Sequence, residues 1–276
     1  MKHKKIMIIL MTIAGLILIS LLAGKIISGI QFSKEVKELF SGSRNLSEKI
    51  YIQDQLSGLP ETVQKYFKHV LKEGQHYISY ARIKHAGQFK PGFDKDWTNI
   101  TGEQYATTEK PGFIWKGSTS MFVARDMFID DKGRLVVSLF SLYNIVDAKG
   151  EQYDQGELLR WLGESILYPT NLLPSTRLKW FPISKLTAKL TFDYNEHSLF
   201  FLVTFNETGE ITQMETKRYM DNEKLETWII KIGNYKEINN VIVPTSFEVL
   251  WRLTKGDFSY AKFYITEIEY DKAEKF

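Results

Sequence analysis

An uncharged apolar run near the N-terminus constrains this chain more than any other feature of its sequence. From Ile6 to Gly24 every residue is apolar or small, and residues 26–30 extend the stretch after Lys25. About 20 helical residues cross the roughly 30 Å hydrocarbon core of a bilayer. No later segment of the sequence approaches that length without charges. The sequence therefore predicts one transmembrane helix, over residues 6–30.

The same run bears on the choice between a signal anchor and a cleaved signal peptide. Cleaved signal peptides carry a shorter apolar region, about 7–15 residues, followed by a small-x-small site. Residues 21–23 match such a site poorly, so we expect an uncleaved anchor, with cleavage as the alternative. The basic tail, residues 1–5, precedes the run, and the positive-inside tendency places it in the cytoplasm. The rest of this cell-membrane protein is then extracytoplasmic, in the cell envelope.

Charge and cysteine content exclude several classes of partner and site. Four basic residues flank the apolar run; removing them from the 36 Lys and Arg leaves 32, against 33 Asp and Glu. This balance lacks the basic face that nucleic-acid binding needs. Cysteine is absent, so disulfides, thiolate metal sites, thiol nucleophiles and lipoprotein acylation are excluded. The bilayer is the one partner that the sequence indicates, through the N-terminal helix.

After the apolar run, the sequence predicts a linker and then a firmer helix. Residues 31–58 are mostly polar, which indicates a juxtamembrane linker with a short helix. A helix begins at Leu59-Pro60-Glu61, because proline suits the first turn and glutamate complements the helix N-terminus. Apolar residues follow at helical spacing to Leu71, and Gly74 closes the helix.

Beyond this helix, apolar residues recur at every second position. From Lys185 to Tyr194 polar and apolar residues alternate, which is typical of an antiparallel strand with one buried face. One helix, Asp154 to Leu167, interrupts the strands and ends before two prolines. Turn signals predict a meander of hairpins, at residues 130–133, 148–150, 206–209, 238–240 and 254–257. We expect an α+β, mainly antiparallel β domain over residues 59–271, with a short tail at 272–276.

The sequence holds no catalytic or metal-binding motif. None of the five histidines has a partner in an H-E-x-x-H-like pattern, and the nucleophile elbow and the glycine-rich phosphate loops are missing. Acidic pairs such as Asp130-Asp131 fit turns, and Glu267 with Glu269 fits an exposed strand face. We expect no cofactor and no metal. An enzyme remains the alternative, with a site that forms only in three dimensions.

Aromatic residues beside glycine or proline are the candidates for a ligand site. Large rings near kinks can line an apolar pocket in the mouth of a curved sheet, and they can equally fill a core. In the helix expected from Asp154 to Leu167, Glu157 and Arg160 form either a surface ion pair or part of a clamp for an anionic headgroup. The ligand-cavity candidates are Trp97, Tyr105, Phe113, Trp115, Leu158, Arg160, Trp161 and Trp180.

Several motifs resemble an uncharacterised bacterial family that is often membrane-anchored. They are Pro111-Gly112-Phe113-Ile114-Trp115, Gly156-Glu157-Leu158-Leu159-Arg160-Trp161-Leu162 and Pro169-Thr170-Asn171-Leu172-Leu173-Pro174, together with Leu59-Pro60 and Val243-Pro244-Thr245. The resemblance covers residues 59–271 and implies no assigned activity.

More distantly, residues 235–245 are similar to the closing hairpin of the LolA-type lipoprotein-carrier half-barrels. That likeness implies a curved sheet wrapped around helices, with an apolar cavity for acyl chains, although fold does not fix function. The leading hypothesis is noncatalytic binding of a lipid or other apolar ligand at the outer face of a membrane. The alternatives are a cell-envelope enzyme and a scaffold subunit of a membrane complex with unknown protein partners.

Overall fold

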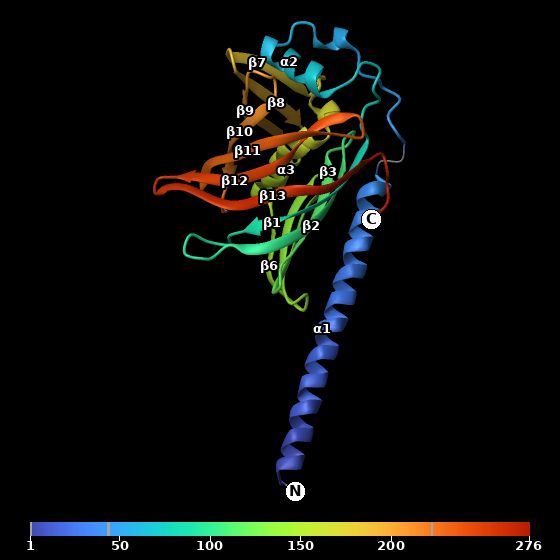
Figure 1. The fold of residues 1–276 in the computed structure, drawn as a ribbon, viewed down its shortest axis with the longest axis vertical. Helices are drawn as coiled ribbons and strands as arrows, with labels where there is room; N and C mark the ends of the chain where they lie inside the picture. The colour runs from blue at the N-terminus through green and yellow to red at the C-terminus, as the bar shows by residue number, and fades with distance from the viewer. Residues whose placement is uncertain (1, 43–44, 222) are drawn as a thin grey trace.

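Thirteen strands form one continuous antiparallel sheet in the computed structural model, which describes residues 2–42, 45–221 and 223–276 (Figure 1). The spatial order of the strands is β6-β5-β4-β3-β2-β1-β13-β12-β11-β10-β9-β8-β7. Strands β1–β6 therefore form one arm and β7–β13 the other, joined where the first strand pairs with the last. The sheet curves around a helix (Figure 1), which confirms the predicted half-barrel.

Each strand except β1 and β7 follows its sheet neighbour directly in the chain, as in a meander. The first arm contains β1 Tyr80–Phe89, β2 Thr98–Thr107, β3 Gly112–Ser118, β4 Phe122–Ile129, β5 Lys132–Leu139 and β6 Tyr143–Lys149. The second contains β7 Leu178–Ser184, β8 Thr187–Tyr194, β9 His197–Phe205, β10 Ile211–Tyr219, β11 Leu225–Ile238, β12 Val241–Leu253 and β13 Gly256–Tyr270. The helices are α1 Lys2–Ser41, α2 Glu61–Val70 and α3 Glu151–Glu164, with short 3-10 helices η1 Gln53–Leu56, η2 Ser165–Leu167 and η3 Pro169–Leu172.

The predicted turn signals connect neighbouring strands at four of their five positions. Residues 130–133, 206–209, 238–240 and 254–257 lie at the β4–β5, β9–β10, β11–β12 and β12–β13 hairpins. The fifth, residues 148–150, is wrong as a hairpin, because Gly150 leads from β6 directly into α3. Its φ of 129° suits glycine in that abrupt change of direction.

Two helices fill the concave side of the sheet. Helix α3 begins at Glu151, three residues before the predicted start, and contacts β3–β6 of one arm and β9–β10 of the other. Helix α2 begins after Pro60 as predicted and contacts β8 and β12. Leu158 and Trp161 of α3 are at most 1% exposed, so these side chains pack as core.

The convex side of the sheet carries a second, smaller core. Helix α1 continues without a break to Ser41, and its last turns bury Phe32, Val36, Leu39 and Phe40. They pack against outward side chains of the first arm, Tyr80, Tyr105, Ile114 and Met127. Strand β3 is therefore buried on both faces.

A buried ion pair adds to this contact, because Glu35 of α1 accepts hydrogen bonds from Arg125 of β4. The expectation of a linker with a separate short helix after residue 30 is thus corrected: the helix itself continues and docks on the sheet. The domain limits at residues 59 and 271 stay predictions, and a fragment cut at Leu59 would lose all of these α1 contacts.

The first part of α1 projects beyond the sheet (Figure 1). It is long and apolar enough to cross a membrane, with a mean hydropathy of 2.9 over its best window, none of which is buried. By length and composition, this segment fits a single-pass anchor or a signal sequence.

Candidate functional site

Five charged residues meet between α3 and the two arms of the sheet. Glu157, Arg160 and Glu164 lie on α3, Asp126 lies on β4 of one arm, and Arg218 lies on β10 of the other. Alternation along β4 places Asp126 on the concave face, whereas its neighbour Arg125 meets α1 on the convex face. We call these five residues the charge cluster.

The two arginines of the charge cluster hold different carboxylates. Arg160 pairs with Asp126 and donates from Nε to Glu164 Oε1 at 2.8 Å. Gln104 donates to the other Glu164 oxygen at 2.7 Å. Arg218 donates from Nη2 to Glu157 Oε1 at 3.1 Å. The predicted local pair of Glu157 with Arg160 is therefore wrong: each pairs with a residue on a distant strand.

Gly156 makes room for one of these contacts. A Cβ atom at this position would lie 3.2 Å from Arg218 Nε, tighter than an ordinary van der Waals contact. The glycine therefore lets the guanidinium lie directly against α3, one residue before its partner Glu157. The Gly156–Arg160 part of the sequence motif thus supplies two members of the charge cluster and the glycine against which Arg218 lies.

Burial and mutual repulsion place a proton in the charge cluster. Burial, with the Asp126 charge as the next cause, raises the pKa of Glu157 to about 8, and burial also raises the pKa of Asp126. Asp126 Oδ1 and Glu157 Oε2 have no hydrogen-bond partner among the described residues. Three carboxyl groups face two guanidinium groups, so one proton on Glu157 at neutral pH balances the charge.

Aromatic rings of β3 lie against one side of the charge cluster. The Arg160 guanidinium lies 4.8 Å from the Trp115 ring centroid and 5.1 Å from that of Phe113. Trp115 Nε1 donates to His85 Nε2 at 2.6 Å. Burial, with the Arg160 charge as the second cause, lowers the pKa of His85 to about 4, so the imidazole is a neutral acceptor at physiological pH.

A second set of rings extends from the charge cluster to the surface. Arg218 lies 4.7 Å from the Trp228 ring, and neighbouring centroids then follow at 6.4 Å to Trp251, 6.3 Å to Tyr260, 6.3 Å to Phe258 and 4.2 Å to Phe93. We call these five rings the aromatic row. Its outer end, Phe93, is 47% exposed, whereas Trp228 at the inner end is 3% exposed.

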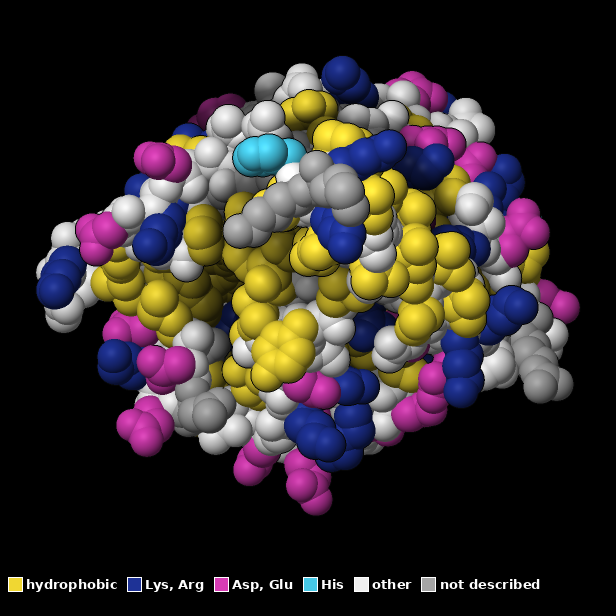
Figure 2. Space-filling view, turned by 90° about the horizontal axis from the view of Figure 1, so that it is seen from below, with side chains coloured by type: hydrophobic (Ala, Val, Ile, Leu, Met, Phe, Trp, Pro, Cys, Tyr) yellow, Lys and Arg dark blue, Asp and Glu magenta, His cyan; other side chains and the backbone are white. Residues whose placement is uncertain are grey.

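The aromatic row lies on the central strands of the half-barrel. Four of its rings belong to β11, β12 and β13, and Phe93 belongs to the β1–β2 connection. Half-buried apolar side chains on the same core extend this surface, namely Phe89, Val249, Leu253 and Phe263. Seen from the side toward which the N-terminal part of α1 points, the molecule shows apolar side chains around a recess, some of them from α1 itself (Figure 2).

The eight predicted ligand-cavity residues fall into four places. Phe113, Trp115, Leu158, Arg160 and Trp161 come together around α3, where Trp161 Nε1 donates to the Thr107 carbonyl at 2.8 Å. Trp180 packs at the other arm against Phe67. Tyr105 lies on the convex face under α1, and Trp97 is half-buried beside Lys262. That any of them contacts a ligand stays a prediction, whereas the charge cluster residues Asp126, Glu164 and Arg218 were missed.

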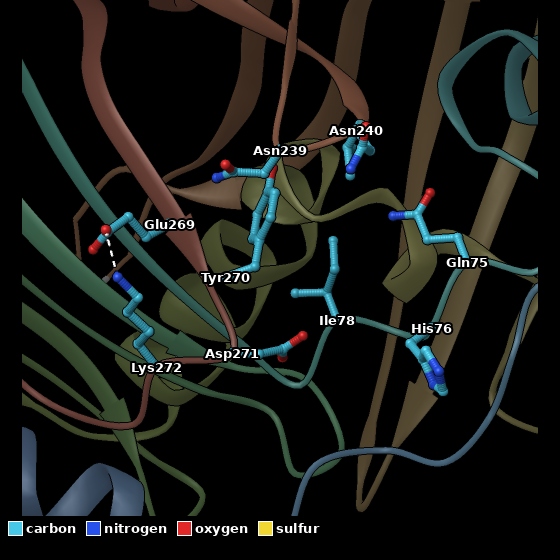
Figure 3. Close-up of a pocket in the computed structure, with 10 residues that line it drawn as sticks. Gln75, His76, Ile78, Asn239, Asn240, Glu269, Tyr270, Asp271 and Lys272 are labelled. Atoms are coloured by element: carbon cyan, nitrogen blue, oxygen red, sulfur yellow. Dashed lines mark hydrogen bonds and ion pairs between the residues drawn. The ribbon is translucent and has the colours of Figure 1, made fainter.

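A separate recess of about 320 Å³ lies near the end of β13 (Figure 3). Its polar groups serve the fold: Asp271 accepts from the backbone N–H groups of Ser79 and Tyr80, and Asn239 donates to the Ile268 carbonyl. Among the residues that the structure describes, no group of histidines and carboxylates could hold a metal ion.

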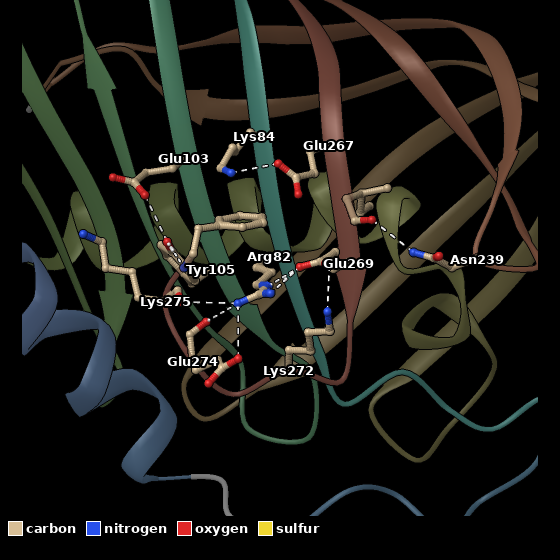
Figure 4. A network of polar contacts seen from close by, with 12 residues as sticks. Arg82, Lys84, Glu103, Tyr105, Asn239, Glu267, Glu269, Lys272, Glu274 and Lys275 are labelled. Atoms are coloured by element: carbon tan, nitrogen blue, oxygen red, sulfur yellow. Dashed lines mark hydrogen bonds and ion pairs between the residues drawn. The ribbon is translucent and has the colours of Figure 1, made fainter.

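The C-terminal tail packs on the convex face rather than extending away (Figure 4). Arg82 pairs with Glu269 and donates to the carbonyls of Glu274 and Lys275. The Arg82 guanidinium also lies 4.5 Å from the Phe276 ring. This network holds the C-terminus beside the end of α1, on the face of the sheet opposite to the charge cluster.

Comparisons with solved structures give distant likenesses. A domain assigned to outer membrane lipoprotein sorting from Vibrio parahaemolyticus is 9% identical, with a TM-score of 0.42, over 79% of this chain and 94% of that one. A LolA superfamily protein from Nitrosomonas europaea is 12% identical, with a TM-score of 0.38, over 78% and 95%. A DUF1329 family protein from Desulfovibrio piger is 8% identical, with a TM-score of 0.41, over 87% and 93%. These likenesses concern the fold alone.

No curated protein matches this chain. A family model described as "family of unknown function (DUF6544)" matches residues 49–263, which is most of the chain and includes the motifs around Trp115, Arg160 and Leu172. This match confirms the resemblance to an uncharacterised family. The protein is a member of DUF6544.

Proposed function

We propose that this protein is a single-pass, membrane-anchored binding protein for a lipid or other apolar ligand, held outside the cytoplasm and without catalytic activity. The observation that carries the proposal is the aromatic row, which runs from exposed Phe93 to buried Trp228 on the concave side of the half-barrel. Rings in such a row offer an apolar surface along which an acyl chain can lie.

The contact between α1 and the sheet supports the anchoring part of the proposal. Phe32, Val36 and Phe40 pack on the sheet, and Glu35 pairs with Arg125 in the same interface. The exposed apolar part of α1 continues from this interface as one helix. A helix docked in this way holds the domain close to the bilayer that it crosses, and therefore close to a supply of lipid.

The arrangement of α3 supports the binding part. The main contacts of α3 are with β4 and β5 on one side and with β10 on the other, whereas β12 is contacted by α2 and η2. Side chains of the aromatic row cover the remaining inner face of β11, β12 and β13. At the inner end, Arg218 Nε has no partner among the described residues. A ligand with an apolar chain and an anionic group would find partners for both.

An enzyme is the second candidate, because the pKa of Glu157 is raised to about 8 beside a second carboxyl group. Buried carboxyl pairs of this kind serve as acids and bases in active sites, and structural ion-pair networks also perturb pKa values. Here Arg218 holds Glu157 and Arg160 holds Asp126, and the Glu157 side chain is 4% exposed. These contacts favour a structural network over an acid–base pair.

Replacing Phe93 by serine is expected to weaken binding of a fatty acid. Burying a phenylalanine side chain against a ligand contributes about 1.5–3 kcal/mol, so loss of this partly exposed ring should raise the dissociation constant about tenfold. Energy transfer from tryptophan to parinaric acid measures the affinity for the full chain in detergent. All six tryptophans lie outside α1, so ligand in the domain gives a stronger signal than ligand beside the projecting part of the apolar helix.

Phe181→Ser is the matched control for this measurement. Phe181 is 46% exposed on β7, and no ring contact with the aromatic row is described for it. The Phe181 variant should bind like the wild type. Equal affinities of the wild type and both variants, or no energy transfer in the wild type, would remove the aromatic row as the ligand site.

A further inference from the structure

We infer that two hairpin turns, β3–β4 at residues 119–121 and β5–β6 at residues 140–142, enter the outer interface of the bilayer. We call them the membrane-facing turns. The inference depends on the proposed crossing of the bilayer by α1, and it adds a second contact between the domain and lipid. That contact is separate from the charge cluster and from the aromatic row.

The position of the β5–β6 turn along α1 is the first argument. A Cβ atom added at Gly24 would lie 2.6 Å from Leu142 Cδ2 and 2.9 Å from the Ser141 carbonyl oxygen, so the turn touches the helix there (Figure 1). The uncharged run from Ile6 to Gly24 reaches about 28 Å at 1.5 Å per residue, close to the roughly 30 Å of hydrocarbon. The turn therefore lies at the height where the hydrocarbon of the outer leaflet ends.

The membrane-facing turns carry exposed apolar side chains, and so does the start of β6 beside them. The exposed fractions are 48% for Met121, 43% for Phe140 and 51% for Leu142 in the turns, and 70% for Tyr143 and 48% for Ile145 on β6. The Phe140 N–H donates to the Met121 carbonyl at 2.7 Å, which joins the two turns into one surface. A surface of this kind in water would be unfavourable, whereas contact with lipid covers it.

Helix α1 is mostly apolar just beyond this height, where Lys25 is the one charged residue before Gln31. Ile26, Ile27 and Ile30 follow Gly24, and they are 64%, 65% and 66% exposed. Lipid that covers these isoleucines surrounds the helix at about the height at which the β5–β6 turn touches it. Tyr143 adds an aromatic ring with a polar end, a residue type enriched at bilayer interfaces.

Charge distinguishes the two ends of the same strands. Residues 117–124 and 135–146, which contain the membrane-facing turns, carry no charged side chain. The opposite end of β4 and β5 turns through Asp130, Asp131 and Lys132. Charged side chains are strongly disfavoured in hydrocarbon, so the uncharged end is the one that lipid can accept.

Backbone conformation gives an independent argument. Phe140 and Ser141 have φ values of 51° and 61°, in the left-handed region where glycine and asparagine are favoured. A bulky aromatic residue in such a turn lowers the stability of the fold. Strained residues of this kind occur where a function depends on the side chain, and here the ring is placed at the bilayer surface.

Single-cysteine labelling tests this inference in the full chain, because the protein has no cysteine of its own. An NBD fluorophore is attached to Met121→Cys or Tyr143→Cys in nanodiscs of phosphatidylcholine and phosphatidylglycerol. Lys132→Cys, at the other end of the same strands, is the aqueous control, and Leu16→Cys within α1 is the lipid control. Doxyl-labelled lipid quenches labels in the bilayer, and iodide quenches labels in water.

The labels at 121 and 143 are expected to be quenched by doxyl lipid and protected from iodide, as at 16, whereas the label at 132 shows the reverse. Iodide quenching at 121 and 143 with lipid quenching at 16 would overturn the inference and leave the anchor intact. Protection from both quenchers would indicate a protein partner instead. Failure of lipid to quench the label at 16 would remove the anchor, and the inference with it.

A second variant separates lipid contact from folding. Phe140→Asn places a residue that favours left-handed φ in the turn and removes the apolar ring. Its melting temperature is expected to equal or exceed that of the wild type, while lipid quenching of the label at 121 decreases. A lower melting temperature, or unchanged lipid quenching, would contradict the role assigned to Phe140.

Discussion

Replacing Arg160 by methionine is expected to lower the free energy of unfolding by about 3–5 kcal/mol, the range for removing one partner of a buried ion pair. Methionine resembles the unbranched stem of arginine but leaves Asp126 and Glu164 without their shared cation. These two side chains are 18% and 24% exposed, so water compensates them poorly. Urea denaturation followed by circular dichroism measures the loss.

Arg134→Met is the matched control. Arg134 donates to both oxygens of Asp147 at 2.8 and 2.7 Å, but these side chains are 37% and 43% exposed. Its replacement should lower the free energy of unfolding by less than about 1 kcal/mol. Adding Asp126→Asn to Arg160→Met should recover part of the loss, because the unpaired charge is removed. Equal losses in the two arginine variants would mean that the charge cluster is no more buried than the surface.

The pH dependence of stability gives the second large effect. The pKa of Glu157 is about 8 in the folded protein, against 4.5 as its ordinary value. Between these pH values the folded state binds more protons than the unfolded state, so the free energy of unfolding falls as pH rises. The decrease extends from about pH 5 to pH 8 and amounts to several kcal/mol at most, from about 1.4 kcal/mol per unit of pKa.

Glu157→Gln removes this contribution. Glutamine resembles the protonated acid, so the variant should match the wild type near pH 5 and exceed its stability at pH 8. Glu207→Gln, in a turn where Glu207 is 70% exposed, is the control and should follow the wild-type curve. Melting temperatures measured from pH 5 to pH 8 check both. A wild-type slope retained in Glu157→Gln would show that Glu157 is ionised across this range.

Local signals in the sequence predicted most of the secondary structure. Pro60 and Glu61 mark the start of α2, and alternation from Lys185 matches β8, whose Ala188, Leu190 and Phe192 are buried. The end of α1 was missed, although Phe32, Val36, Leu39 and Phe40 have helical spacing, because polar residues separate them. The turn at Phe140 was missed because it lacks the glycine or asparagine of an ordinary hairpin.

The charge cluster could be predicted only in part. Arg160 was identified, but its partner Asp126 is 34 residues away and lies on another element. Glu157 and Arg218 are 61 residues apart and meet only because α3 bridges the two arms. The curvature of the sheet brings these residues together, and no local sequence pattern predicts that curvature. An inward-facing charge on an otherwise apolar strand face, as at Asp126 and Arg218, is the signal that could have found them.

Photocrosslinking tests the central claim most directly. A photoactivatable fatty acid is added to the full chain in detergent, irradiated, and located by mass spectrometry of proteolytic peptides. We expect crosslinks in residues 89–97 and 249–260, which contain the outer part of the aromatic row. Crosslinks confined to α1 and the membrane-facing turns would contradict a ligand site inside the half-barrel and leave only a membrane anchor.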